Sequence, residues 1–472
     1  MFKKALCLAL ITLLIFGVVG CGDNNREDDV VTLTWLVPGD AQSDVAAVME
    51  KVNEITVPKI GAKVDLQFID TSAYDKRMKM NMASSSSFDL CFSGWVNNYA
   101  SAVRNGGLMD ITDIVKSETP TLYESLPDYL WDFAYQNGKI YGVPNLQIYA
   151  MPMSLVFFKD IADKYDFDFN SINKIEDVEP YLQMVKDGEN GKIIPFRLEE
   201  TYKLWTAEKY EIIVSNIAIN IETHEIVNIV ETPEYERARV KLQDWMKKGY
   251  IRSDQLSVGN DFSDYKAGRY AVSPEGWKPG LEAEMKANFG KDVFFRDVVP
   301  TYMSMAHGTN TITAVGANSQ NPEKSVKLIE LLNTDKKLYN LICFGIEGKH
   351  YNLDNEGKVV AVKDSGYEPQ ADWKFGNQFN ALLREGQEDD IWEKTRAIND
   401  SAVKSPMIGF ALDDSNIKTE LSQISAISSE YNILVMTDVQ RNEYLKKLED
   451  AGIDKVIKEL QTQFDTFSKN KN

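Results

Sequence analysis

Hydrophobic and polar positions alternate along the chain with two different periods. Residues 30–37 are rich in β-branched and aromatic side chains and end at a Pro-Gly pair, which predicts a strand followed by a turn. Residues 45–52 place apolar side chains three and four positions apart, as on one face of a helix, and residues 64–69 alternate as a strand does. This succession predicts an α/β fold with mainly parallel sheets that are flanked by helices.

The same alternation continues towards the C-terminus. Further strands are predicted at 88–92 and 270–273, and a helix is predicted at 233–248, where Thr232 can cap the first turn and Pro233 can begin it. No stretch rich in Pro, Gly and Ser interrupts this pattern. If the chain forms two lobes, we therefore expect strands rather than a flexible linker to join them.

The N-terminal segment has the pattern of an export signal. Two lysines precede an apolar run over residues 5–19, which is shorter than the ~20 residues of a membrane-spanning helix. The run ends in Val-Val-Gly before Cys21, and this sequence resembles a bacterial lipobox. We expect residues 1–20 to be a lipoprotein signal peptide, Cys21 to carry lipid, and residues 21–29 to be a flexible tether at the outer face of the cytoplasmic membrane.

Composition narrows the possible partners. The net charge of −19 disfavours nucleic acid, which needs basic patches that displace its counterions.

Hydrophobic residues make up 43% of the chain, enough for a packed core. Beyond the predicted lipidation site, Cys91 and Cys343 lie in apolar surroundings that predict buried thiols, although one disulfide between them stays open.

Motifs for catalysis and metal binding are incomplete. The chain has only three histidines, and His224-Glu225 lacks the second histidine of a zinc site because residue 228 is Asn. With 71 acidic residues, no pair of carboxylates stands out as a glycosidase site. We therefore predict no enzyme, no cofactor and no metal, and keep a lipid-anchored carbohydrate-active enzyme as an alternative.

Polar and aromatic side chains gather where three predicted strands end. Ligands of open α/β sheets bind beyond the carboxyl ends of the strands. Tryptophan and tyrosine can stack on the apolar faces of a sugar, while carboxylates and amides bind its hydroxyls, so this mixture favours a carbohydrate site. The candidates at these strand ends are Asp40, Trp95, Asn97, Tyr99, Glu275 and Trp277.

Several longer segments carry a resemblance to a known family. They are residues 88–95, 106–112, 137–144, 266–272 and 318–325. In order and spacing they resemble the extracellular solute-binding lipoproteins of ATP-binding-cassette (ABC) importers, in the broad sugar-binding family. The stretches 339–351 and 443–455 resemble a subfamily with a C-terminal domain of unassigned role.

This resemblance implies a two-lobed, periplasmic-binding-protein-like fold of type II. Lobe 1 would comprise 30–147 and 293–334, and lobe 2 would comprise 152–289 and 336–472 with the C-terminal extension. The chain would cross between the lobes near 147–152, 289–293 and 333–336.

The resemblance also places the candidate site and its partners. Trp95 and the segment 275–277 would face the cleft from opposite lobes, with Asn145 and Tyr149 beside the first crossing. The protein would be a monomer that captures a solute, expected to be an oligosaccharide, and delivers it to ABC permease subunits. A peptide or another small solute stays an alternative ligand.

Overall fold

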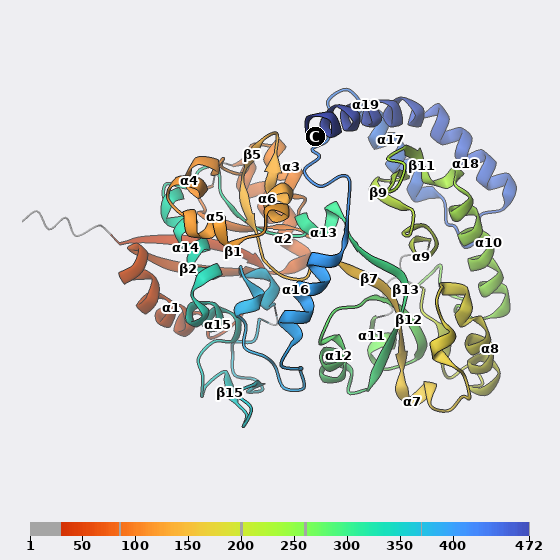
Figure 1. The fold of residues 1–472 in the computed structure, drawn as a ribbon, viewed down its shortest axis with the longest axis horizontal. Helices are drawn as coiled ribbons and strands as arrows, with labels where there is room; N and C mark the ends of the chain where they lie inside the picture. Colours follow the sequence, from red (N-terminus) through yellow and green to blue (C-terminus); the bar gives the residue numbers. More distant parts are fainter. Residues whose placement is uncertain (1–29, 85, 199–201, 259–261, 370, 472) are drawn as a thin grey trace, which may run out of the picture.

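The computed structural model describes residues 30–84, 86–198, 202–258, 262–369 and 371–471. Two lobes lie side by side, each with its own sheet, helices and hydrophobic core (Figure 1). The predicted signal peptide, Cys21 and the tether lie outside the described residues.

Lobe 1 is built on a five-stranded sheet of order β2-β1-β3-β14-β6. The strand β1 (Val31–Pro38) pairs in parallel with β2 (Ala62–Ile69) and β3 (Leu90–Gly94), as the alternation of strand and helix predicts. The strand β14 (Thr311–Val315) runs antiparallel to β3 and to β6 (Gly142–Pro144). The helices of this lobe are α1 (Val45–Ile60), α2 (Thr71–Ala83), α3 (Tyr99–Arg104), α4 (Thr112–Ser117), α5 (Pro120–Ser125), α6 (Asp128–Ala134), α14 (Pro322–Thr334) and α15 (Lys336–Phe344).

Lobe 2 contains a second five-stranded sheet, of order β17-β13-β7-β12-β8, and a smaller three-stranded sheet. In the larger sheet β7 (Met151–Phe158) runs antiparallel to both of its neighbours, β12 (Tyr270–Gly276) and β13 (Val293–Met303). The edge strands are β8 (Ile194–Phe196) and β17 (Val403–Lys404), and the small sheet comprises β9 (Tyr210–Val214), β10 (Ile217–Asn220) and β11 (Ile226–Asn228). The helices are α7 (Lys159–Ala162), α8 (Glu179–Gly188), α9 (Lys203–Thr206), α10 (Pro233–Lys248), α11 (Phe262–Lys266), α12 (Leu281–Phe289), α17 (Lys418–Glu430), α18 (Asp438–Asp450) and α19 (Ile453–Lys471).

The two-lobed α/β architecture is confirmed, but the expectation of mainly parallel sheets is wrong, because both large sheets are mixed. The cause is the path of the chain between the lobes. The strand β14 arrives from lobe 2 and begins opposite the end of β3, with Thr311 beside Gly94. A strand that enters at this edge has to run against β3, whereas β1, β2 and β3 all run towards it.

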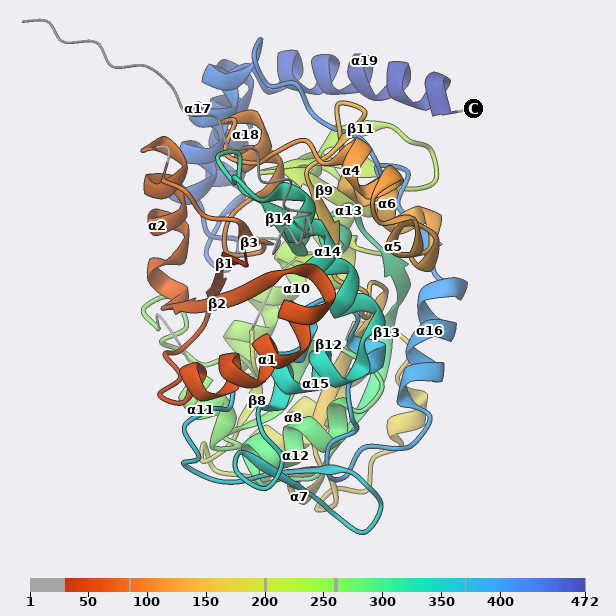
Figure 2. The same cartoon turned by 90° about the vertical axis from the view of Figure 1, so that its left-hand side faces the viewer.

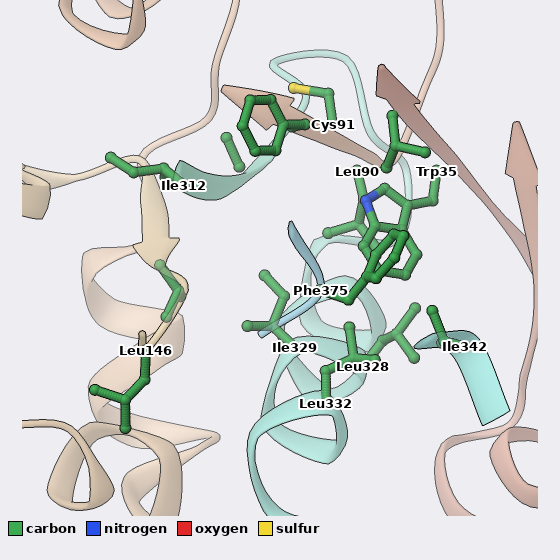
Figure 3. Close-up of a cluster of buried hydrophobic side chains, with 14 of the residues drawn as sticks. Trp35, Leu90, Cys91, Leu146, Ile312, Leu328, Ile329, Leu332, Ile342 and Phe375 are labelled. Carbon is green, nitrogen blue, oxygen red and sulfur yellow. The ribbon is translucent and has the colours of Figure 1, made fainter. Parts of the chain in front are cut away.

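The path of the chain also differs from the predicted division at two places. The strand β13 pairs with β7 from Val293 to Tyr302, so the second crossing is the short helix α13 (Met305–Thr309) and its flanking residues. Residues 336–381 pack into lobe 1, where the rings of Phe375 and Trp35 meet edge to face with centroids 5.6 Å apart (Figure 3). The helix break after α14 is a turn between two helices on one core, and the chain returns to lobe 2 only through α16 (Ile391–Ser401).

The C-terminal helices join the small sheet of lobe 2. Figures 1 and 2 show α17, α18 and α19 beside β9 and β11. The Nδ2 of Asn216 donates to Ser428 Oγ over 2.7 Å, and the backbone N–H of Ile226 donates to Gln461 Oε1 over 2.8 Å. The helices α17, α18 and α19 are thus part of the body of lobe 2.

Local signals explain the ends of individual helices. At the start of α10, Thr232 Oγ1 accepts a hydrogen bond from the backbone N–H of Tyr235, and Pro233 occupies the first turn, as predicted. The helix ends at Gly249, whose φ of 75° favours a residue without a Cβ atom.

Candidate functional site

The loop after β3 presents Trp95 towards the space between the lobes. The backbones of Gly94 and Asn97 exchange hydrogen bonds of 3.0 and 3.1 Å, and the N–H of Trp95 donates to Asn310 O in the second crossing over 3.0 Å. A Cβ atom on Gly94 would lie 1.8 Å from the same Asn310 oxygen, so only glycine fits there. The tight loop leaves the Trp95 side chain 53% exposed.

Two cavities meet between the lobes. The larger, which we call the Trp95 cavity, measures about 630 Å³ and is lined by residues 94–101 and Arg104 of lobe 1, β9 of lobe 2 and the C-terminal domain. The second, which we call the Glu275 cavity, measures about 510 Å³ and lies over β7, β12 and β13. Glu211, Ile212 and Ala306 line both cavities, so the two adjoin, and we refer to them together as the groove. Both lobes line the Trp95 cavity, whereas lobe 2 and the second crossing line the Glu275 cavity.

A buried carboxylate stands where the two cavities meet. Glu211 Oε2 accepts a hydrogen bond of 2.7 Å from the Tyr302 hydroxyl and one from Ser405 Oγ, while Oε1 accepts one of 2.8 Å from the backbone N–H of Met305. Burial raises the pKa of Glu211, and these hydrogen bonds oppose the shift. Glu211 therefore fastens β9 to the second crossing and to the residues after β17.

Sequence reasoning missed Glu211. A single carboxylate inside the run Tyr-Glu-Ile-Ile-Val was a usable signal, because an acidic side chain on a half-buried strand needs a polar partner.

Besides Trp95, three of the predicted residues line the groove. They are Asn97, Tyr99 and Glu275, of which Asn97 and Tyr99 are mostly buried. Asn97 Oδ1 accepts a hydrogen bond from the Gly94 N–H over 3.2 Å, and the Tyr99 hydroxyl donates to Ala134 O over 2.7 Å. The hydrogen bonds of Asn97 and Tyr99 support the loop that carries the exposed indole, whereas Glu275 lines the adjoining cavity.

Asn145 and Tyr149 lie at the first crossing, as the resemblance implies, but inside it. Asn145 Nδ2 donates to Lys374 O over 2.8 Å, and the Tyr149 hydroxyl donates to Asn145 O. Neither residue is among those that line the two cavities, and both are almost completely buried. Asn399 of α16 holds the same segment, since its Oδ1 accepts from the Tyr149 N–H over 2.8 Å and its Nδ2 donates to Gln147 O over 2.7 Å.

The structure separates Asp40 and Trp277 from the groove. Asp40 is exposed beyond the end of β1, where its charge partly offsets the lowering by burial of the Lys374 pKa. Trp277 Nε1 donates to Glu282 Oε1 of α12 over 2.9 Å, and its ring lines a different pocket with Phe294 and Arg296. That pocket shares no lining residue with the Trp95 or Glu275 cavity, so Glu275 and Gly276 of the segment 275–277 line the groove and Trp277 does not.

Acidic side chains outnumber basic ones in the groove. The carboxylates are Asp75, Glu211, Glu275 and Asp414. Among the basic lining residues, Arg104 lies 3.8 Å from Asp414, and Lys203 also has a partner of its own. Within the described residues, no group of three or more His, Cys, Asp or Glu side chains could hold a metal ion.

Two further predictions concern the cysteines and the membrane. Cys91 and Cys343 are both buried free thiols, as their apolar surroundings predict, and burial raises the pKa of each.

In the part of the chain that the structure covers, no helix has both the length and the apolar character needed to span a bilayer.

Paired lobes joined by crossing segments, with an aromatic and polar groove between them, define the class of two-lobed solute-binding proteins. The comparisons with known proteins confirm this class and the resemblance. The chain is 26% identical, over 99% of both chains, to a carbohydrate ABC transporter substrate-binding protein of Streptococcus pneumoniae serotype 4. Residues 406–469 match the family model of a domain of unknown function, DUF3502.

Two solved structures of one protein are similar in fold to this chain over nearly its whole length. The crystal structure of the N-glycan transport solute-binding protein NgtS from Streptococcus pneumoniae matches with a TM-score of 0.84 and 25% identity, over 93% of this chain and 100% of that one. The structure of NgtS in complex with Man5GlcNAc matches with a TM-score of 0.74 and 25% identity, over 93% and 99% of the two chains.

Proposed function

We propose that the chain captures an oligosaccharide in the groove between its lobes and delivers it unchanged to the permease of an ABC importer. The observation that carries this proposal is the cavity that both lobes line, with the half-exposed indole of Trp95 in its wall and the Glu275 cavity adjoining it. The named function of the Streptococcus relative and the complex of NgtS with a glycan support it.

The chemistry of the groove suits a sugar. The Trp95 ring can stack on an apolar sugar face, and such aromatic contacts contribute roughly 0.5–1.5 kcal/mol beyond area burial. Asn98, Gln136 and Asn310 line the same cavity, and side-chain amides are groups that can bind sugar hydroxyls. Together with the carboxylates they could reach about −8 kcal/mol, which is micromolar affinity.

The charges of the groove favour a neutral sugar. An anionic glycan needs arginine or lysine to compensate its charge. Arg104 lies beside Asp414, Lys203 has its own partner, and carboxylates line both cavities. We infer that sialylated or uronic-acid glycans bind more weakly than neutral ones.

Capture would proceed by closure of the lobes. A ligand stabilises the closed form only if it binds that form more tightly, and it does so when both walls contact it at once. The closed form would then dock on the permease as a monomer held at the outer membrane face by lipid on Cys21.

The test is titration calorimetry with Man5GlcNAc on the protein without residues 1–20. We expect micromolar binding that Trp95→Ala weakens by roughly two orders of magnitude, because both stacking and apolar burial are lost. Trp277→Ala is the matched control, since it removes an indole outside the groove.

Three results would contradict the proposal. Absence of binding across a panel of neutral glycans would remove the carbohydrate function. Displacement of Man5GlcNAc by short peptides would favour a peptide carrier. Cleavage of the glycan during incubation, seen by mass spectrometry, would favour the carbohydrate-active enzyme.

A further inference from the structure

The C-terminal domain reaches the groove although its family has no assigned role. The larger cavity is lined not only by the two lobes but also by the first part of residues 406–469. Its lining residues from this domain are Met407, Phe410, Ala411, Leu412, Asp414 and Leu421.

The segment that carries these residues is firmly supported. The backbone N–H of Asp413 donates to Gln463 Oε1 over 3.0 Å, and Gln463 Nε2 donates back to Asp413 O over 2.9 Å. The ring of Phe410 packs against Phe464 and Phe467 of α19, with centroids 6.0 and 5.7 Å apart. The long terminal helix therefore fixes the loop at the edge of the groove.

The same segment touches both lobes. Ile408 is buried in the core of lobe 1, whereas its neighbours Met407 and Phe410 are buried in the core of lobe 2. Across the mouth of the groove, Arg104 of α3 lies 3.8 Å from the Asp414 carboxylate. The C-terminal domain is thus placed between the lobes and is not an appendage on the outer surface of lobe 2.

We infer that this domain forms a third wall of the ligand site, and that Leu412 and Asp414 help to select the ligand; this inference rests on the proposed function. Both side chains are partly exposed and line the cavity that contains Trp95. Leu412 offers an apolar surface to a sugar face, and the Asp414 carboxylate accepts hydrogen bonds from hydroxyls while Arg104 orients it.

Two measurements with Man5GlcNAc test this role. In calorimetry, Leu412→Ala and Asp414→Asn are each expected to weaken binding by about tenfold. The control is Val439→Ala in α18, which removes an apolar side chain that is 77% exposed in the same domain and does not line the groove. In hydrogen exchange on the unaltered protein, residues 407–421 are expected to gain protection when the glycan binds.

The outcomes separate this inference from the proposed function. If the unaltered protein binds Man5GlcNAc and Trp95→Ala weakens binding by roughly two orders of magnitude, the function stands. If the Leu412 and Asp414 variants then bind like Val439→Ala, and residues 407–421 gain no protection, the third wall is refuted alone. Failure of the unaltered protein to bind any glycan refutes both.

Discussion

Two tryptophans that follow strand ends, one in each lobe, have different surroundings. Trp95 follows β3 in a loop that is closed on itself and tied to the second crossing, and its side chain stays 53% exposed beside a cavity of about 630 Å³. Trp277 follows β12, but α12 begins four residues later, and Glu282 of this helix accepts a hydrogen bond from the indole N–H. An aromatic residue at a strand end thus becomes a candidate ligand contact only when no following element captures its ring.

The largest effect is expected from a methyl group added at Gly94, the residue before Trp95. In Gly94→Ala the new methyl group would overlap Asn310 O at 1.8 Å, so the loop or the crossing has to move. We expect a loss of about 3 kcal/mol or more in unfolding free energy and no measurable glycan binding. Urea denaturation and calorimetry would show both.

The control lies at the other strand end. In Gly276→Ala the nearest atom is 3.5 Å from the new methyl group, which is an ordinary contact. This variant should fold with nearly unchanged stability, and equal loss in both variants would contradict the steric explanation.

A smaller effect is expected from Glu275, the carboxylate that lines the adjoining cavity over β7, β12 and β13. Glu275→Gln should weaken Man5GlcNAc binding by about tenfold, because a charged acceptor binds hydroxyls more strongly than an amide does. Glu282→Gln, which alters the partner of Trp277, should leave the dissociation constant unchanged. Calorimetry on the two variants tests whether the difference between the tryptophans extends to their neighbours.

The contribution of Glu211, at the junction of the two cavities, to the stability of the protein should depend on pH. Burial raises the pKa of Glu211, so the folded protein keeps this proton at pH values where the unfolded chain, with a pKa of about 4.3, has lost it. Stability from this group therefore falls as pH rises above about 4.3 and levels off above the folded pKa.

Glu211→Gln removes this titration while its amide oxygen can still accept from the Met305 N–H. Urea denaturation at several pH values should show the variant gaining stability relative to the unaltered protein as pH rises. A constant difference would contradict the assigned shift.

The smallest effect is expected at Trp277 itself. Trp277→Phe removes the hydrogen bond to Glu282, which contributes about 1 kcal/mol to stability, and leaves both cavities of the groove intact. The thermal midpoint should fall slightly while glycan affinity stays the same. A tenfold loss of affinity would show that the pocket beside Phe294 takes part in binding.

Local patterns in the sequence predicted the features that depend on local contacts. Thr232 and Pro233 begin α10 as expected, and a strand precedes Trp95 as predicted, although it spans Leu90–Gly94 and not residues 88–92. These features follow from hydrogen bonds and side-chain periods within a few residues.

Long-range pairing could not be predicted in the same way. The pairing of β13 with β7 and the packing of Phe375 on Trp35 join residues more than a hundred positions apart, and no period in the sequence records them. The burial of Glu211 depends on distant partners, because Tyr302 and Ser405, 91 and 194 positions away, donate hydrogen bonds to its carboxylate.

The hydrogen bond from the backbone N–H of Trp95 to Asn310 O ties the Trp95 loop to the second crossing, one of the segments about which the lobes would rotate. In a rotation, displacement grows with distance from the axis, so points on the rim sweep widely while points near the pivot hardly move. The Trp95 ring would therefore move little during closure, and the far wall of the groove would move towards it.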